Sequence, residues 1–118
     1  MNFVLVFLGG GLGSVCRYLI AKLMSDNQMD FPIATFIANV ISCIILGYLI
    51  GLSLRNGISD NSKLLMMTGF CGGFSTFSTF SGEIILLMQE GQLSTAMIYI
   101  AASLAICLVC IWAGIKLA

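Results

Sequence analysis

Four long apolar stretches constrain the fold of this 118-residue chain more than any other feature. They cover roughly residues 3–23, 31–54, 64–88 and 93–117, and short polar segments separate them. Each stretch reaches the ~20 residues that an α-helix needs to cross a ~30 Å hydrocarbon layer. The first is not a signal peptide, because it lacks a basic start and three further spans follow it. The sequence therefore predicts an all-α membrane protein with a single four-helix transmembrane domain over residues 1–118.

The composition agrees with a membrane location and excludes several function classes. Hydrophobic residues make up 59% of the chain and charged residues 8%, whereas soluble domains carry about 25% charged residues. Five Lys and Arg balance five Asp and Glu, so no cationic surface for nucleic acid is expected. Histidine is absent, which removes the His-dependent catalytic pairs, and no phosphate-binding glycine loop opens a soluble helix. We therefore expect no enzyme and no nucleic-acid partner.

The cysteines lie within the apolar stretches and show no metal-ligand spacing, so we interpret them as small apolar packing residues. They are Cys16, Cys43, Cys71, Cys107 and Cys110. Small or polar residues also recur at a spacing of four in two stretches, where they suit close helix contacts. These residues are Thr35, Asn39, Cys43, Gly47 and Gly51 in the second stretch, and Tyr99, Ser103 and Cys107 in the fourth.

The distribution of basic residues predicts a symmetric insertion. Four spans place both termini on one side, which would carry Arg55, Lys63 and Lys116, while Lys22 and nearby Arg17 would mark the other side. Orientation follows the Lys and Arg bias, which is nearly absent here. We infer that the chain inserts in both orientations and pairs as an antiparallel homodimer. Four packed helices leave little room for a central pathway, so a transport route would need a second subunit. A single orientation with a weak signal is the alternative.

The third stretch is not an ordinary membrane helix. Residues 68–83 contain four glycines and six hydroxyl residues, and Gly72-Gly73 precedes Ser75-Thr76. Glycine weakens a helix and hydroxyls compete for backbone bonds. Broken backbone at membrane depth requires protein or a water-filled cavity around it, and its freed groups can bind ions. This pattern predicts an ion pathway, with a kink for packing alone as the alternative.

Five further side chains are candidates for that pathway. Phe77 and Phe80 share one side of a helix and could present positive ring edges to an anion, and the Asn39 amide could donate to it. The alternative for the two phenylalanines is a packing or lipid-facing role, and for Asn39 it is a hydrogen bond between helices. Glu83 and Arg17 are the charged residues inside apolar runs. Glu83 is either a structural group or a vestibule residue, and Arg17 either reaches the interface through its stem or attracts anions at a pore entrance.

Taken together, these residues resemble the Fluc/CrcB family of fluoride channels. The resemblance covers nearly the whole chain, and its most specific part is GFCGGFSTFSTF at 69–80, followed by Glu83. Gly10-Gly11-Leu12-Gly13 leading to Arg17-Tyr18, Asn39, and the spacing of Tyr99 and Ser103 also match. Two positions depart from the family pattern. Cys107 stands where a hydroxyl residue is often found, and Phe74-Ser75-Thr76 stands where Thr-Thr is common.

The resemblance implies a dual-topology homodimer in the cell (inner) membrane, with two parallel pores that export fluoride passively and protect the cell. It implies a structural sodium ion at the dimer axis, held by the backbone carbonyls of Gly72 and Ser75. The fluoride pathway would be formed by Asn39, Phe77, Phe80, Ser78, Thr79, Tyr99 and Ser103. Arg17 and Glu83 would be vestibule or structural charges.

Two other functions are alternatives to a fluoride channel. A proton-coupled small multidrug exporter of dual topology needs an acidic residue deep in its first span, where this chain has only Arg17, although Glu83 could replace it. A structural or assembly protein would not need a polar break at the membrane centre.

Overall fold

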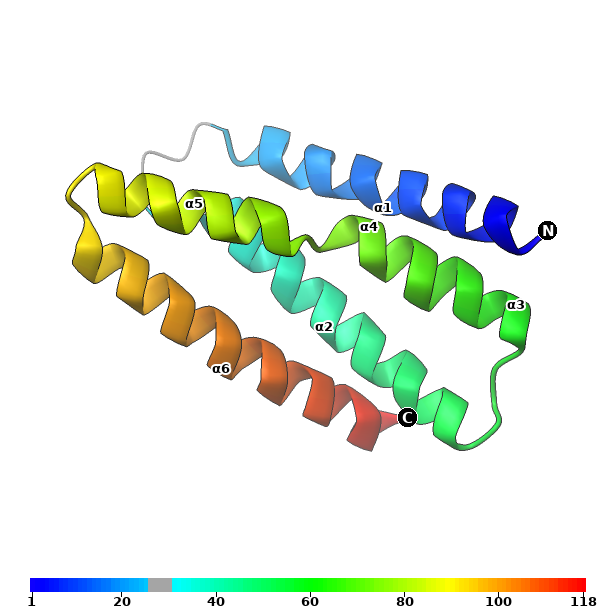
Figure 1. Ribbon diagram of the computed structural model, residues 1–118. Coiled ribbons are helices and arrows are strands. Elements are labelled where there is room, and N and C mark those ends of the chain that lie inside the picture. The colour runs from blue at the N-terminus through cyan, green and yellow to red at the C-terminus, as the bar shows by residue number, and fades with distance from the viewer. Residues whose placement is uncertain (26–30) are drawn as a thin grey trace.

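The computed structural model describes residues 1–25 and 31–118, and all of its regular elements are helical. Three uninterrupted helices are α1 (Asn2–Leu23), α2 (Ile33–Leu54) and α6 (Leu93–Leu117). The segment Asp60–Gln89 completes four that are long and apolar enough to cross a membrane. Successive spans run in opposite directions, so that α1 begins and α6 ends toward the same end of the bundle (Figure 1). The predicted spans agree with these bounds to within a few residues.

The third span consists of consecutive helical pieces that meet at a bend. It contains α3 (Asp60–Ser62), the π-helical η1 (Lys63–Cys71), α4 (Gly72–Phe74) and α5 (Phe77–Gln89). Between α4 and α5, Ser75 and Thr76 have extended backbone angles, with φ/ψ of −107°/144° and −143°/129°. We call these two residues the joint. Gly72 and Gly73 remain helical, so the irregular backbone follows the glycines rather than including them.

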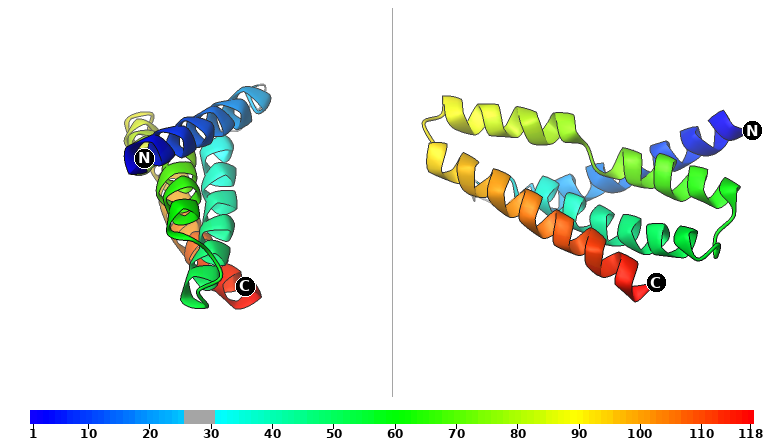
Figure 2. Two further views of the ribbon diagram at one scale, coloured as in Figure 1. Left: turned by 90° about the vertical axis from the view of Figure 1, so that its right-hand side faces the viewer. Right: turned by 60° about the horizontal axis from the view of Figure 1, so that its bottom comes forward.

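The third span changes its packing partner at the joint. Before it, η1 and α4 pack along α1, whereas after it α5 packs on α6. Helix α2 packs along α6 and also contacts η1 (Figure 2). The joint therefore connects two differently packed halves of the bundle and lies beside α2.

Glycines allow the closest helix contacts on both sides of the bundle. A Cβ atom at Gly114 of α6 would lie 2.7 Å from the backbone nitrogen of Tyr48 in α2. One at Gly73 of α4 would lie 2.9 Å from the Cα atom of Gly10 in α1. Real Cβ contacts are not this short, so these crossings depend on the missing side chain.

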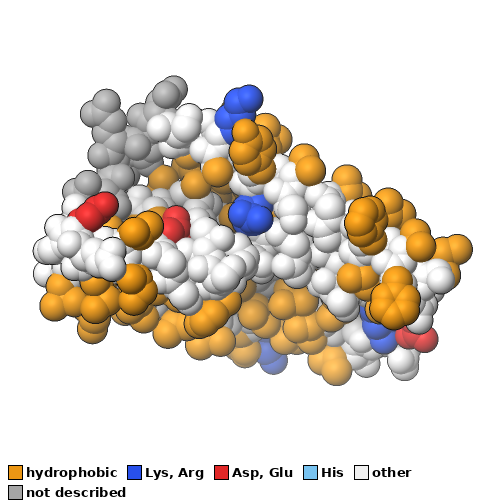
Figure 3. All heavy atoms as spheres, turned by 45° about the horizontal axis from the view of Figure 1, so that its top comes forward, with side chains coloured by type: hydrophobic (Ala, Val, Ile, Leu, Met, Phe, Trp, Pro, Cys, Tyr) orange, Lys and Arg blue, Asp and Glu red, His pale blue; other side chains and the backbone are white. Residues whose placement is uncertain are grey.

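The exterior is apolar, as a bilayer requires. Phe3 is 91% exposed and Phe7 77% exposed, while the buried hydrophobic cluster is small. That cluster consists of Phe80, Leu87, Ala96 and Tyr99. On the face shown in Figure 3, hydrophobic side chains gather along the edges, backbone and other side chains occupy the middle, and charged groups are few. Such a surface is costly in water and suited to lipid.

Candidate functional site

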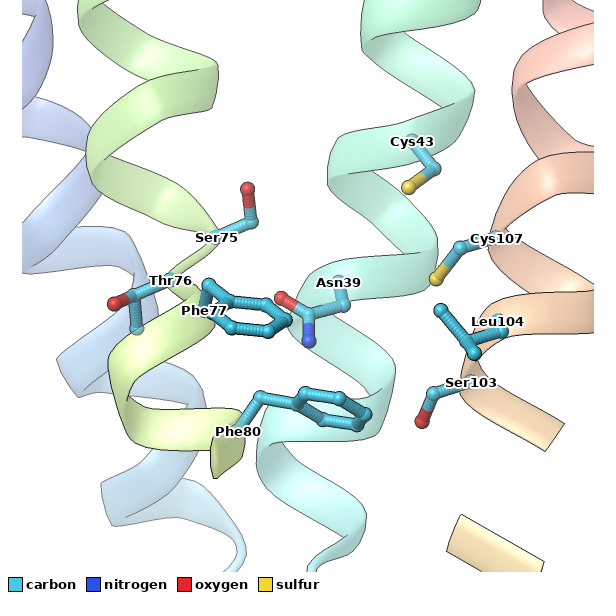
Figure 4. A pocket seen from close by; sticks show the side chains of 9 residues that line it. All are labelled: Asn39, Cys43, Ser75, Thr76, Phe77, Phe80, Ser103, Leu104 and Cys107. Carbon is cyan, nitrogen blue, oxygen red and sulfur yellow. The ribbon is translucent and has the colours of Figure 1, made fainter. Parts of the chain in front are cut away.

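A cavity of about 220 Å³ lies where the joint, the start of α5, α2 and α6 meet. Its lining residues come from all of these elements (Figure 4). They are Asn39, Cys43, Ser75, Thr76, Phe77, Phe80, Ser103, Leu104 and Cys107. Four residues predicted for the fluoride pathway therefore share one cavity, which also includes the joint.

The two phenylalanines line the cavity in different settings. Helix α5 begins at Phe77, directly after the joint, so Phe77 and Phe80 are one helical turn apart. Their ring centroids are separated by 5.9 Å at an interplanar angle of 45°. Phe80 is 7% exposed and its ring centroid lies 4.9 Å from that of Tyr99, whereas Phe77 is 77% exposed in the protomer. One ring is thus fixed by packing, and the other borders open space.

Two polar side chains reach the space beside these rings. The Asn39 amide from α2 lies next to the Phe77 ring, and the Ser103 hydroxyl from α6 points toward Phe80 (Figure 4). Ser103 is 5% exposed, and its hydroxyl has no hydrogen-bond partner among the described residues. A buried hydroxyl without a partner is rare in proteins, because the lost hydration is uncompensated. The Ser103 hydroxyl is therefore an unpaired donor at the wall of the cavity.

Glu83 is held by two hydroxyl groups behind the phenylalanines. Thr35 Oγ1 donates to Glu83 Oε2 at 3.0 Å, and the Tyr99 hydroxyl donates to Oε1 at 3.0 Å. Tyr99 is fully buried and does not line the cavity. Tyr99 affects the site indirectly, because its ring packs against Phe80 and its hydroxyl binds Glu83. From the sequence, Thr35 is expected only as a small residue in a helix contact, and its bond to Glu83 is not predicted.

The joint interrupts the backbone hydrogen bonds of the third span. The Ser75 N–H donates to the Cys71 carbonyl at 3.1 Å, and the series resumes with the Phe80 N–H, which donates to Thr76 at 3.4 Å. In the described part of the chain, no backbone N–H outside the regular helices donates to the carbonyl of Gly72 or of Ser75. The same holds for the carbonyls of Gly73 and Phe74, so several carbonyl groups beside the joint need partners other than the backbone.

Arg17 lies against the same bend from the other side. Its Nε donates to the Gly73 carbonyl at 3.4 Å, and Ser14 Oγ donates to that carbonyl at 3.5 Å. The guanidinium therefore caps a carbonyl near the end of α4 instead of extending freely toward the interface. This contact places positive charge beside the joint.

Comparison with known proteins places the chain in a family. Residues 4–115 match the family model described as CrcB-like protein, Camphor Resistance (CrcB). The chain belongs to the CrcB family. It is accordingly a multi-pass integral membrane protein of the cell membrane, as predicted.

Several CrcB relatives carry a functional name. A protein of Flavobacterium psychrophilum is named fluoride-specific ion channel FluC and is 42% identical over 115 residues, which are 96% of this chain and 93% of the relative. Another of that name, from Methylobacillus flagellatus, is 40% identical over 97% of this chain and 91% of its own length. Fluoride-specific ion channel FluC 2 of Rhodococcus jostii is 42% identical over 99% of this chain and 98% of its own length.

Other predicted site residues of this CrcB chain lie near the cavity without lining it. Ser78 is exposed, and its hydroxyl oxygen lies 2.9 Å from that of Thr76; Thr79 is half-buried on the next position. Conversely, Cys43 and Leu104 line the cavity and were not predicted for it. The signal for Cys43 was present in its spacing of four from Asn39. Nothing in the sequence distinguishes Leu104 from the other leucines of the fourth span.

Proposed function

We propose that this CrcB protein is a fluoride-selective passive channel that exports fluoride from the cell and relieves its toxicity. The fluoride specificity is taken from the names of the relatives, which align over nearly the full chain. A channel moves its ion without chemical conversion, so the protein is a transporter rather than an enzyme. The export direction follows from passive flow out of a cell that has accumulated the ion.

The unpartnered Ser103 hydroxyl, in a cavity bordered by Phe77 and Phe80, carries the proposal. Fluoride is small and strongly hydrated, so donors must replace its water. A hydroxyl donates well to an anion, and charge-assisted bonds are stronger than neutral ones. Phenylalanine ring edges carry partial positive charge and add weaker support. The Asn39 amide supplies a second kind of donor, and a narrow pore completed by a second copy would disfavour larger anions.

The remaining predicted pathway residues extend this route. The hydroxyls of Ser78 and Thr79 sit on the first turn of α5 beside the rings, where they would receive the ion at the exposed side. Tyr99 keeps Phe80 in place and, with Thr35, satisfies Glu83. This arrangement favours a structural role for the Glu83 carboxyl group, while Arg17 would attract anions toward the joint.

We further propose that the working unit is an antiparallel homodimer. Extended backbone at membrane depth cannot face lipid, because its polar groups would be unsatisfied. Within one protomer, however, Gly72 is exposed and Phe77 is 77% exposed at the joint. A second copy in the opposite orientation would cover this face, and the nearly balanced basic residues permit both orientations. Each copy would then complete the other's cavity, giving two pathways.

A sodium ion at the dimer axis would bind the carbonyls of Gly72 and Ser75. Both carbonyls are among those beside the joint that accept no backbone hydrogen bond in the described residues. Hard cations prefer oxygen ligands, and paired protomers would contribute four carbonyls. A bound cation supplies fixed positive charge near the anion route. The chain's own part is to keep the joint extended, so that both carbonyls remain free.

Fluoride efflux from liposomes tests the proposal. Purified protein is reconstituted, liposomes are loaded with potassium fluoride or potassium chloride, and efflux is followed with an ion-selective electrode after valinomycin is added. Fluoride efflux without a pH gradient, together with negligible chloride efflux, is expected. Flux that requires a pH gradient would support the exporter alternative, and no flux in either case would overturn the channel.

A further inference from the structure

Two cysteines from neighbouring helices line the same part of the cavity. Cys43 lies on α2 and Cys107 on α6, and both line the cavity. Their sulfur atoms point into the same space between the helices (Figure 4). Both residues are free cysteines and neither is fully buried. The pair therefore offers two sulfur atoms to whatever enters the cavity.

The packing of α2 on α6 holds this pair together. Gly47 follows Cys43 by one helical turn, and Ile111 follows Cys107 by one turn. A Cβ atom at Gly47 would lie 2.8 Å from the Cα atom of Ile111, so the two backbones nearly touch at that level. Two helices in backbone contact cannot separate easily one turn away. The approach of the two sulfurs is thus built into the helix crossing.

Thiols serve a fluoride route poorly, because an S–H group is a weak donor. Sulfur is instead a soft ligand that selects soft metal ions. Within residues 1–25 and 31–118, no group of three or more His, Cys, Asp and Glu side chains is arranged to hold a metal. A tetrahedral zinc-type site is therefore not available here. A pair of thiols is instead enough for a d¹⁰ cation that binds two sulfur ligands.

We propose that Cys43 and Cys107 form a two-sulfur binding site for a thiophilic d¹⁰ cation, and that the bound ion closes the cavity. With Hg²⁺ as the probe, both S–H bonds break, two S–Hg bonds form and two protons leave to water. No electron is transferred. The product is neutral, which suits a membrane interior where an uncompensated charge is costly. Closure of the cavity rests on the proposed function, whereas binding of the metal does not.

Binding is tested on the purified full-length protein with Hg²⁺ in excess small monothiol. The monothiol removes mercury from single cysteines, but a preorganised pair retains it through its effective concentration. One mercury per chain is expected for the wild type by intact-protein mass spectrometry. Cys43→Ser and Cys107→Ser should each bind about 100-fold more weakly. Cys16→Ser on α1 is the matched control and should bind as the wild type does.

A second measurement needs no variant and therefore does not depend on the variants folding. Wild-type protein is alkylated with a small maleimide before and after Hg²⁺ is added, and the labelled peptides are quantified. Protection of Cys43 and Cys107 together, with Cys16 still labelled, supports the pair. Retained binding in either single variant, or protection of only one of the two cysteines, would overturn the site.

Fluoride efflux then tests closure. Hg²⁺ should abolish efflux through the wild type, a dithiol chelator should restore it, and Cys16→Ser should remain sensitive. Stoichiometric binding with undiminished efflux would overturn closure of the pathway. If no protein conducts fluoride at all, the proposed function fails, while the binding and labelling results still decide the metal site.

Discussion

Tyr99 and Glu83 are joined by a hydrogen bond of 3.0 Å, although the tyrosine ring also packs 4.9 Å from Phe80. A single fully buried side chain thus links the intramembrane carboxyl group to an aromatic wall of the cavity. Its two contacts can be separated by substitution, because phenylalanine preserves the ring and removes the hydroxyl.

Tyr99→Phe should destabilise the folded protein by about 1 kcal/mol, the usual scale for a hydrogen bond between membrane helices. The measurement is the free energy of unfolding in mixed micelles. Tyr18→Phe is the control, because Tyr18 is 67% exposed. Equal losses in both variants would show that the bond to Glu83 contributes nothing specific.

Ser103→Ala should separate stability from transport. The hydroxyl has no partner in the described residues, so the variant should be as stable as the wild type or more stable. Fluoride efflux should nevertheless fall about 10- to 100-fold, since a hydrogen bond to a charged group contributes roughly 1.5–3 kcal/mol. Ser94→Ala, at an exposed position of α6, is the control. Normal efflux through Ser103→Ala would remove Ser103 from the route.

Phe80→Ile should reduce fluoride efflux at least about 10-fold while leaving the oligomeric state unchanged, because the ring edge rather than bulk is lost. Efflux and light scattering of the purified protein measure the two effects. Phe7→Ile is the control, because Phe7 of α1 is 77% exposed, and this variant should conduct normally. Unaltered efflux in Phe80→Ile would assign this ring to packing alone.

Asn39→Asp should impair conduction by charge repulsion. Two like charges about 4 Å apart repel by about 4 kcal/mol at an effective dielectric constant of 20, so efflux should fall at least about 100-fold. The same change at Asn61, an exposed residue of α3, controls for added charge. Full activity of Asn39→Asp would give Asn39 a role in helix packing.

Gly114→Ala should destabilise the protein by about 1–3 kcal/mol, since its Cβ would lie 2.7 Å from the backbone of Tyr48. Gly82→Ala is the matched control, because no atom lies within 4 Å of the added Cβ. That control should be neutral or stabilised by about 0.5–1 kcal/mol, as expected for alanine in a helix. Thermal unfolding of both variants decides whether the α2–α6 crossing needs glycine.

The sequence allowed the spans to be predicted because hydropathy directly reflects the solvent that surrounds each helix. It also indicated irregular backbone near Ser75 and Thr76. It did not predict that Gly72 and Gly73 stay helical, because tight packing of Gly73 on α1 outweighs glycine's low helix propensity. The π-helical η1 was likewise missed, since no residue pattern announces the wider turn.

For the site, the sequence named Asn39, Phe77, Phe80 and Ser103, and the structure brings these four residues to one cavity. Their roles in conduction stay predictions. The bond from Thr35 to Glu83 was not predicted, because it joins residues 48 positions apart and depends on how their two helices are rotated about their axes. Hydropathy and residue spacing do not determine how far either helix is rotated about its own axis.

The exchange of packing partners at Ser75 and Thr76 has a consequence for how such a chain can change. One extra residue there would leave both halves of the third span seated in their own contacts, so the protein could still fold. It would, however, rotate Phe77 and Phe80 relative to Asn39 and Ser103. An insertion that still allows the protein to fold would therefore misalign the cavity-lining side chains. The number of residues between Phe74 and Phe77 is thus constrained by the cavity more than by folding.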